Sequence, residues 1–213
     1  MANAFIALSA LAQGQISEQP DDPLNGQFNG QLALQHIAQQ VSFGPRTADY
    51  PGKQKTLNYI QQLLEAEADQ IVVQPFQAHG LSGNNLWASF YAAESNQKNH
   101  PRIMLAAHWD TRPIAERDKL PGKRSEPVIG ANDGASGVAV LLEIARLLSS
   151  QRAPVTVDLV FFDLEDMGNI DGLPFSIGAT EFVRKNAFYR PTAGVVVDMV
   201  CDRDLAIPQE RFS

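Results

Sequence analysis

The sequence contains a single cysteine, Cys201, among 213 residues, and this scarcity limits the chemistry of the chain. One thiol cannot form a disulfide within the chain, and it cannot supply the set of thiolates that a structural zinc site uses. We interpret Cys201 as a small side chain buried at the end of a strand. Any metal site in this chain must therefore use nitrogen and oxygen ligands.

The sequence also lacks a long apolar run and an excess of basic residues. No apolar segment approaches the roughly 20 residues that a membrane helix needs, so we predict no membrane span. Lys and Arg number 17 against 24 Asp and Glu, which gives a net charge of −7. A protein that binds nucleic acid would carry a clustered basic surface. We therefore expect no nucleic-acid partner.

The length of the chain fits one domain, since domains commonly contain about 100 to 200 residues. We interpret residues 1–29, which end in a segment rich in Gln, Asp, Pro and Gly, as a flexible arm, and residues 30–213 as a single domain. Near the N-terminus, a short apolar stretch has the small residues of an export signal but lacks its cationic leader. We expect a periplasmic or secreted protein, and a cytoplasmic location stays open.

The apolar periodicity predicts an alternation of helices and strands. In the first half of the chain we expect helices around residues 34–41 and 57–64, and then strands at residues 71–76 and 85–91 joined by a turn at residues 80–84. In the second half we expect strands at residues 102–107, 155–162 and 193–200, and helices at residues 138–148 and 177–185. Alternating strands and helices imply crossover connections and a mainly parallel sheet. The predicted fold is an α/β three-layer sandwich with a mostly parallel central sheet and an antiparallel edge.

Acidic residues and one histidine recur where these strands end. The residues concerned are His108, Asp110, Glu165, Asp166 and Asp198, and Asp133 lies in a glycine-rich turn before the helix at residues 138–148. In an open α/β sheet, ligands bind outside the carboxyl ends of the strands, so residues far apart in sequence can meet there. Carboxylates and imidazole are the ligands that a divalent metal such as zinc accepts when thiolates are absent.

Each of these positions also has a simpler interpretation. Asp110 could support His108 by accepting a hydrogen bond from its second ring nitrogen, as partners of metal-bound histidines do, or His108 could be a solitary histidine near a turn. Asp133 could be a helix N-cap, while a phosphate loop would need a following Lys and Ser or Thr. Glu165 and Asp166 could divide the roles of general base and metal ligand, or form a solvated turn.

Three segments, in this order, carry a resemblance to a known family: His108–Pro113, Gly130–Gly137 and Phe162–Asp166. Together they resemble the bacterial glutaminyl-peptide cyclotransferases, which belong to the superfamily of zinc-dependent aminopeptidases. The resemblance extends from about Phe43–Arg46 to the end of the chain. It implies a zinc-aminopeptidase-like fold and the conversion of N-terminal glutamine to pyroglutamate, with release of ammonia, on peptides or proteins.

The resemblance also implies roles for individual residues. Asp133 and Asp166 would be zinc ligands, Glu165 the general acid and base, and Asp198 a second catalytic carboxylate. His108 would bind a second metal or serve structurally, and Trp109 would contact the substrate. The order Glu165–Asp166, where aminopeptidases typically have two glutamates, favours the cyclotransferase with one zinc. The alternatives are a two-zinc aminopeptidase and an inactive peptide-binding relative or fragment.

One departure from the family pattern concerns histidine. The last zinc ligand of the family is a histidine well downstream of the strand that ends at Asp198, but no histidine follows His108 in this chain. Neither His36, His79 nor His100 matches that motif. We therefore expect the domain to be incomplete at its C-terminal end.

Overall fold

The fold is built on one mixed sheet of five strands in the order β1-β2-β4-β3-β5, in a computed structural model that describes residues 27–93 and 101–206. The strands are β1 (Gln70–Ala78), β2 (Leu81–Phe90), β3 (Arg102–His108), β4 (Thr156–Phe162) and β5 (Ala193–Val196). Neighbours β1, β2 and β4 run antiparallel, whereas β4, β3 and β5 run parallel. The predicted parallel sheet with an antiparallel edge is confirmed.

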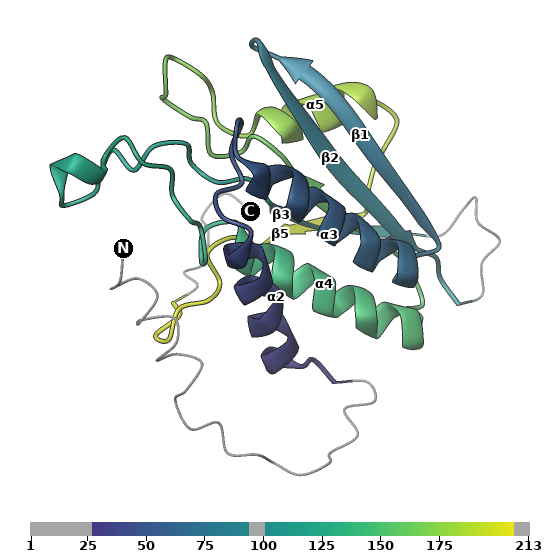
Figure 1. The fold of residues 1–213 in the computed structure, drawn as a ribbon. Helices are drawn as coiled ribbons and strands as arrows, with labels where there is room; N and C mark the ends of the chain where they lie inside the picture. The colour runs from purple at the N-terminus through teal and green to yellow at the C-terminus, as the bar shows by residue number, and fades with distance from the viewer. Residues whose placement is uncertain (1–26, 94–100, 207–213) are drawn as a thin grey trace.

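Helices cover both faces of this sheet. They are α2 (Gly30–Ser42), α3 (Pro51–Glu67), α4 (Ala135–Ser150) and α5 (Ile177–Lys185), with a short 3-10 helix η1 (Pro121–Lys123) in a loop. Figure 1 shows α2, α3 and α4 gathered on one side of the sheet, with α5 beside β1 and β2. The apolar clusters agree, because one joins α3 and α4 to the sheet and another joins α5 to its opposite face. The three-layer prediction is confirmed.

The central strand β4 is buried along its whole length, which explains its nearly continuous apolar sequence. Leu159 and Phe161 pack into the core beneath α3 and α4. Val160 and Phe162, which point to the other face, pack against Phe182 of α5. A strand covered by helices on both faces has no solvated side and therefore needs no polar alternation.

The hairpin between β1 and β2 is tighter than the sequence suggested. The turn was predicted at residues 80–84, but β2 already begins at Leu81 and pairs with Ala78. His79 and Gly80 alone make the turn, with φ of 53° and 78°. Two positive φ values are typical of the two-residue turns whose twist matches that of a hairpin. The predicted turn was therefore too long.

Strand β5 is shorter than predicted, because it ends at Val196 and not at Val200. The chain then leaves the sheet: the N–H of Val200 donates to Ser136 Oγ, and the N–H of Cys201 donates to Asn132 Oδ1. These bonds draw the segment after β5 toward the start of α4. Cys201 is exposed there, so the prediction of a buried cysteine was wrong.

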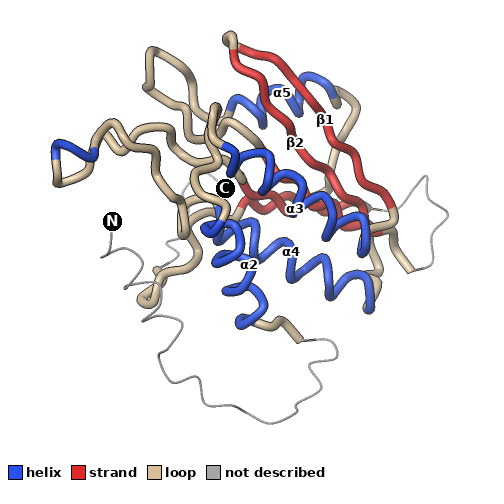
Figure 2. Tube along the Cα trace, viewed as in Figure 1, coloured by secondary structure: helices blue, strands red, loops and turns tan. Residues whose placement is uncertain are grey.

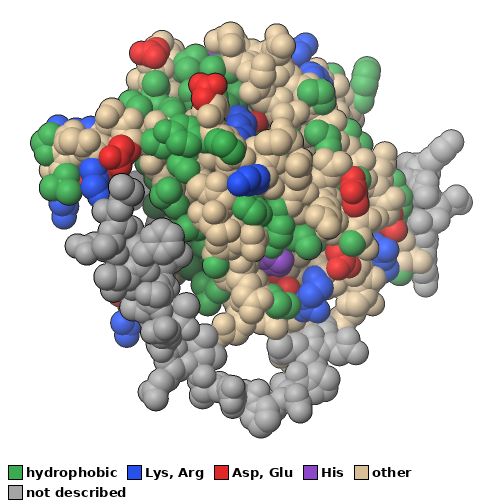
Figure 3. Space-filling model, in the orientation of Figure 1, with side chains coloured by type: hydrophobic (Ala, Val, Ile, Leu, Met, Phe, Trp, Pro, Cys, Tyr) green, Lys and Arg blue, Asp and Glu red, His purple; other side chains and the backbone are tan. Residues whose placement is uncertain are grey.

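Loops gather at one side of the molecule, where the segment that carries η1 projects furthest (Figure 2). On the face shown in Figure 3, Lys and Arg are scattered among acidic and apolar side chains. Among the described residues, no helix has both the length and the apolar character to span a membrane. The apolar stretch behind the expectation of export, and most of the predicted arm, lie outside the described residues.

A buried carboxylate fixes the sheet at the end opposite the loops that follow β3 and β4. Asp158 of β4 is fully buried and accepts hydrogen bonds from Arg102, Trp87, Ser89 and Tyr189. These donors come from β2, β3 and the segment after α5. Because each oxygen of the carboxylate has partners, the cost of its burial is offset, and the network joins three parts of the fold.

Replacing Asp158 by Asn should lower the free energy of unfolding by about 3 kcal/mol, because it leaves the partly buried guanidinium of Arg102 uncompensated. Tyr189→Phe removes only one donor and should cost about 1 kcal/mol. Urea denaturation measures both values. Equal stability of Asp158→Asn and the unchanged protein would contradict this account of the network.

Candidate functional site

The residues singled out at the strand ends lie together in the structure. His108 ends β3, Glu165 and Asp166 follow β4, and Asp198 follows β5. Asp133 arrives from the loop before α4. Because β3, β4 and β5 are parallel neighbours, their carboxyl ends meet at one edge, and the loop of Asp133 folds over that edge.

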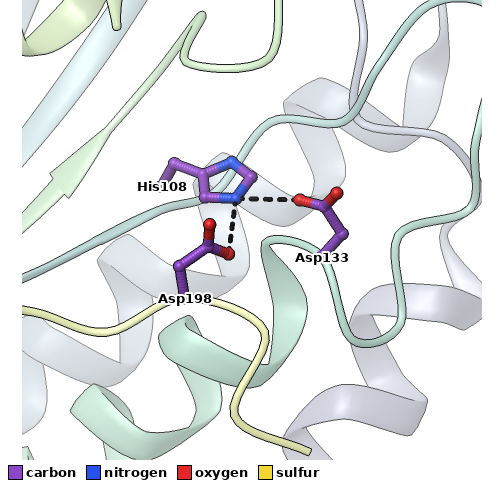
Figure 4. A group of neighbouring side chains, drawn as sticks. All are labelled: His108, Asp133 and Asp198. Atoms are coloured by element: carbon purple, nitrogen blue, oxygen red, sulfur yellow. Dashed lines mark hydrogen bonds and ion pairs between the residues drawn. The ribbon is translucent and has the colours of Figure 1, made fainter. Parts of the chain in front are cut away.

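The closest group consists of His108, Asp133 and Asp198 (Figure 4). His108 Nε2 lies 3.0 Å from Asp133 Oδ1 and 3.3 Å from Asp198 Oδ1. One nitrogen or oxygen from each of the three side chains lies within 4.8 Å of the others. His108 is buried, whereas 38% of the Asp133 side chain and 50% of the Asp198 side chain are exposed. The group therefore opens to solvent on the side of the two carboxylates.

Asp110 connects this group to the turn after β4. It is buried, and its Oδ1 lies 3.3 Å from His108 Nδ1. The same carboxylate accepts the backbone N–H groups of Glu165, at 3.0 Å, and of Asp166, at 3.1 Å. Although burial opposes its charge, the bond to His108 and the two backbone donors lower the pKa of Asp110. Asp110 therefore contacts the imidazole of His108 and also holds the backbone of the turn that carries Glu165 and Asp166.

The carboxylates around His108 favour the charged form of its imidazole. Burial opposes its charge, but hydrogen bonds to the three surrounding carboxylates outweigh burial and raise the pKa of His108 to about 12. In turn, the bond from His108 lowers the pKa of Asp198. A buried histidine between carboxylates is therefore a cation at neutral pH, and it compensates part of their charge.

The side chains of Glu165 and Asp166 point in different directions from the turn and have different partners. Glu165 Oε1 accepts the hydroxyl of Ser176 at 3.0 Å, and burial raises the pKa of Glu165. Asp166 Oδ1 pairs with Arg112 Nη1 at 3.1 Å. Burial and the nearby charge of Asp133 raise the pKa of Asp166 to about 6. The Glu165 carboxylate thus faces Ser176, whereas the Asp166 carboxylate lies close enough to Asp133 to be affected by its charge.

A second buried carboxylate lies beneath the same turn. Asp163 pairs with Lys53 Nζ at 3.0 Å and accepts the backbone N–H of Asn84 at 2.9 Å. Burial raises the pKa of Asp163 to about 6. Asp163 therefore belongs to the support of the turn, and its contacts attach the turn to α3 and to β2.

Two sequence interpretations need correction. Trp109, the predicted substrate contact, has no exposed surface: it packs in the core, and its Nε1–H donates to the carbonyl of Asn84. A side chain enclosed in this way cannot contact a substrate. The alternative of Asp133 as helix N-cap does not hold either, because the cap position of α4 is Gly134 and no side chain caps it.

Several residues at the site were not foreseen from the sequence. Arg112 lies within the motif His108–Pro113, but its contact with Asp166 depends on how two loops meet. Ser176 and Lys53 lie in segments that showed no sign of polar function. Arg46 lies in the Phe43–Arg46 segment, where the family resemblance begins, but the sequence did not indicate what its side chain contacts.

The donor set fits a divalent cation. One imidazole nitrogen and two carboxylate oxygens, with further carboxylates beside them, are ligands that zinc accepts. The surplus of carboxylates over cations around His108 provides the electrostatic attraction, and a metal at Nε2 would have to displace its proton. The described residues hold Asp166 apart from the group of three, with Arg112 as its partner.

Comparison with solved structures shows a close likeness to enzymes of two kinds. The glutaminyl cyclase of Bacteroides thetaiotaomicron, solved with N-acetylhistamine, is 33% identical with a TM-score of 0.72, over 82% of this chain and 63% of that one. A leucine aminopeptidase precursor from the same organism is 32% identical with a TM-score of 0.72, over 83% of this chain and 64% of that one. The chain therefore spans less than two thirds of the length of either structure.

A curated relative and a family profile extend the comparison. The uncharacterized protein YfbL of Escherichia coli is 31% identical over 145 residues, which are 64% of this chain and 41% of that protein. The profile of Peptidase family M28 matches residues 90–209. This match covers more than half of the chain and includes every candidate site residue, and the chain belongs to peptidase family M28.

Proposed function

We propose that the protein is a zinc-dependent glutaminyl-peptide cyclotransferase, which converts N-terminal glutamine to pyroglutamate and releases ammonia. The observation that carries the proposal is Glu165: a half-buried carboxylate with a raised pKa, on a turn that Asp110 ties to His108. The order Glu165–Asp166 and the likeness to a glutaminyl cyclase support the same reaction. Peptides and proteins with N-terminal glutamine are the proposed substrates.

Asp133 and Asp166 would hold the zinc ion. When bound, zinc supplies a Lewis acid that polarises the γ-carbonyl of glutamine and stabilises negative charge on its oxygen. Arg112 holds Asp166 at the edge of the site. His108, as a cation, orients Asp133 and Asp198 through its Nε2. The protein groups thus prepare the charge distribution before the substrate arrives.

The proposed reaction is an internal acyl transfer. Glu165 accepts a proton from the α-amine of the substrate, the amine nitrogen bonds to the carbonyl carbon (Cδ) of the side-chain amide, and the bond from that carbon to the amide nitrogen breaks. Glu165 returns the proton to the departing nitrogen, which leaves as ammonia. Asp198 accepts a hydrogen bond from the reacting amide. Because nucleophile and electrophile belong to one residue, orienting that residue supplies much of the acceleration.

The second candidate is a two-zinc aminopeptidase, and the close group of His108, Asp133 and Asp198 favours it. In that reaction, the three residues would bind a second metal, and Glu165 would take a proton from the water that attacks the first peptide bond. The likeness to a leucine aminopeptidase precursor gives this candidate independent support. The two reactions differ in nucleophile: the substrate's own amine in one, water in the other.

Mass spectrometry of two peptides separates the candidates. With zinc and the protein expressed from its complete reading frame, a peptide that begins with Gln should lose ammonia without being cleaved, and one that begins with Leu should stay intact. A sample without protein controls for spontaneous cyclisation. Release of the first residue from the Leu peptide would reject the cyclotransferase in favour of the aminopeptidase.

Replacing Glu165 by Gln should lower kcat by about 10²- to 10⁴-fold, the usual contribution of a positioned general acid or base. Zinc affinity should change little, because this carboxylate faces Ser176 and is not a proposed ligand. Glu181→Gln, the same chemical change on α5, is the matched control and should leave both values unchanged. Loss of zinc from Glu165→Gln would mean that the roles of Glu165 and Asp166 are reversed.

A further inference from the structure

Arg46 precedes α3 and is fully buried, although arginine is among the residues least often found inside proteins. Its guanidinium donates only to backbone carbonyls. Nε donates to Trp109 at 2.7 Å, Nη1 to Ile129 at 2.9 Å, and Nη2 to Gly130 at 2.7 Å and to Asp133 at 3.2 Å. Burial lowers the pKa of Arg46 to about 10, so the group remains charged at neutral pH.

These carbonyls belong to the two segments that carry the close group of the site. Trp109 lies between His108 and Asp110, and Ile129–Asp133 is the loop that presents the Asp133 carboxylate. No secondary structure joins the two segments. The planar fork of an arginine can bind several oxygens at fixed angles, which a lysine cannot do. Arg46 therefore connects the end of β3 to the loop by its own hydrogen bonds.

The glycines of the loop fit around this guanidinium. A Cβ on Gly130 would clash with Thr111, with the carbonyl oxygen of Asp133 and, at 2.7 Å, with Arg46 Nη2. A Cβ on Gly134 would lie 2.7 Å from the carbonyl oxygen of Asp110 and 3.1 Å from Arg46 Nη2. Both glycines have positive φ, of 63° and 85°. The glycine-rich turn therefore does more than reverse the chain direction. The turn leaves room for the guanidinium of Arg46, and a side chain at Gly130 would clash with this group.

The buried charge also has an electrostatic reason to lie here. The carboxylates of Asp110 and Asp133 are near enough to favour the charged form of Arg46, although neither touches it. A buried cation without a compensating charge would be costly. The guanidinium thus offsets part of the negative charge from behind the site, and it leaves the Asp133 carboxylate exposed on the open side.

We propose that Arg46 is a positioning residue for the metal centre. It fixes the loop at residues 129–134 against the end of β3, so that Asp133 and His108 face one another at the observed 3.0 Å. This inference rests on the proposed metal centre but not on the proposed reaction. Changing Arg46 should therefore alter the zinc affinity, whichever reaction the protein catalyses.

The test is the zinc affinity of Arg46→Lys, in the protein expressed from its complete reading frame. Lysine keeps the charge but cannot bind the carbonyls of both segments at once. Zinc affinity, measured by competition with a chromogenic chelator, should fall by about 10- to 100-fold, as is typical when a residue that orients metal ligands is changed. With cobalt(II) in place of zinc, the visible absorption spectrum should also change, because it reports ligand geometry.

Arg102→Lys is the matched control. Arg102 is a partly buried arginine that pairs with Asp158 at the opposite end of the strands. This variant should lose thermal stability while keeping the zinc affinity and the cobalt spectrum. If Arg46→Lys behaves in the same way as Arg102→Lys, Arg46 is merely a stabilising residue and the inference is wrong.

A pair of glycine variants decides the matter if Arg46→Lys does not fold. Gly130→Ala and Gly80→Ala both place a side chain at positive φ, but only the first meets Arg46 and the carbonyl of Asp133 that Arg46 binds, since nothing lies within 4 Å of a Cβ on Gly80. Zinc affinity should fall in Gly130→Ala alone, and equal affinity in both variants would overturn the inference. If zinc affinity falls as expected but the unchanged protein does not cyclise glutamine, this inference stands and the proposed reaction fails.

Discussion

Carboxylates crowd the carboxyl ends of β3, β4 and β5, and their mutual repulsion is the constraint on which the site depends. Asp110, Asp133 and Asp198 surround one imidazole, and burial together with the nearby charge of Asp133 raises the pKa of Asp166 to about 6. Like charges at this spacing are unfavourable unless cations compensate them. The positively charged side chains at the site reduce this repulsion between the carboxylates.

The cations differ in position, and this difference divides the carboxylates by role. The protonated His108 lies inside the group, and Arg46 lies behind it. Asp110 is enclosed by His108 and by backbone donors, so it is structural. Asp133 and Asp198 keep exposed oxygens, so the remaining negative charge faces the opening. A divalent cation bound to Asp133 would add to this compensation, which is the physical basis for proposing zinc.

Much of this organisation could be predicted because it follows from local pattern and from sheet topology. Alternating strands and helices imply parallel strands, and parallel strands bring residues such as His108 and Asp198 to one edge. The continuous apolar sequence of β4 reflects burial on both faces. The positions of the candidate residues at strand ends were therefore enough to predict that these residues lie close together.

The remaining features depend on contacts between distant segments, which leave no periodic pattern. The chain leaves the sheet after β5, and the side chains of Ser136 and Asn132 accept hydrogen bonds from the backbone N–H groups of Val200 and Cys201. Trp109 is apolar, aromatic and next to the site, yet the core encloses it completely. Arg46 lies far from Asp133 in sequence, and only the folded chain shows that its guanidinium holds that loop. The burial of such residues and their hydrogen-bond partners depend on the tertiary structure and cannot be predicted from the local sequence.

The central claim is that this arrangement of charge serves one catalytic zinc ion. The most direct measurement is the zinc content per chain, determined by native mass spectrometry, of the protein from its complete reading frame and of its Asp198→Asn variant. The account predicts one zinc ion in both, because Asp198 acts on the substrate and not on the metal. Two zinc ions in the unchanged protein, falling to one in Asp198→Asn, would contradict it and establish Asp198 as a ligand of a second metal.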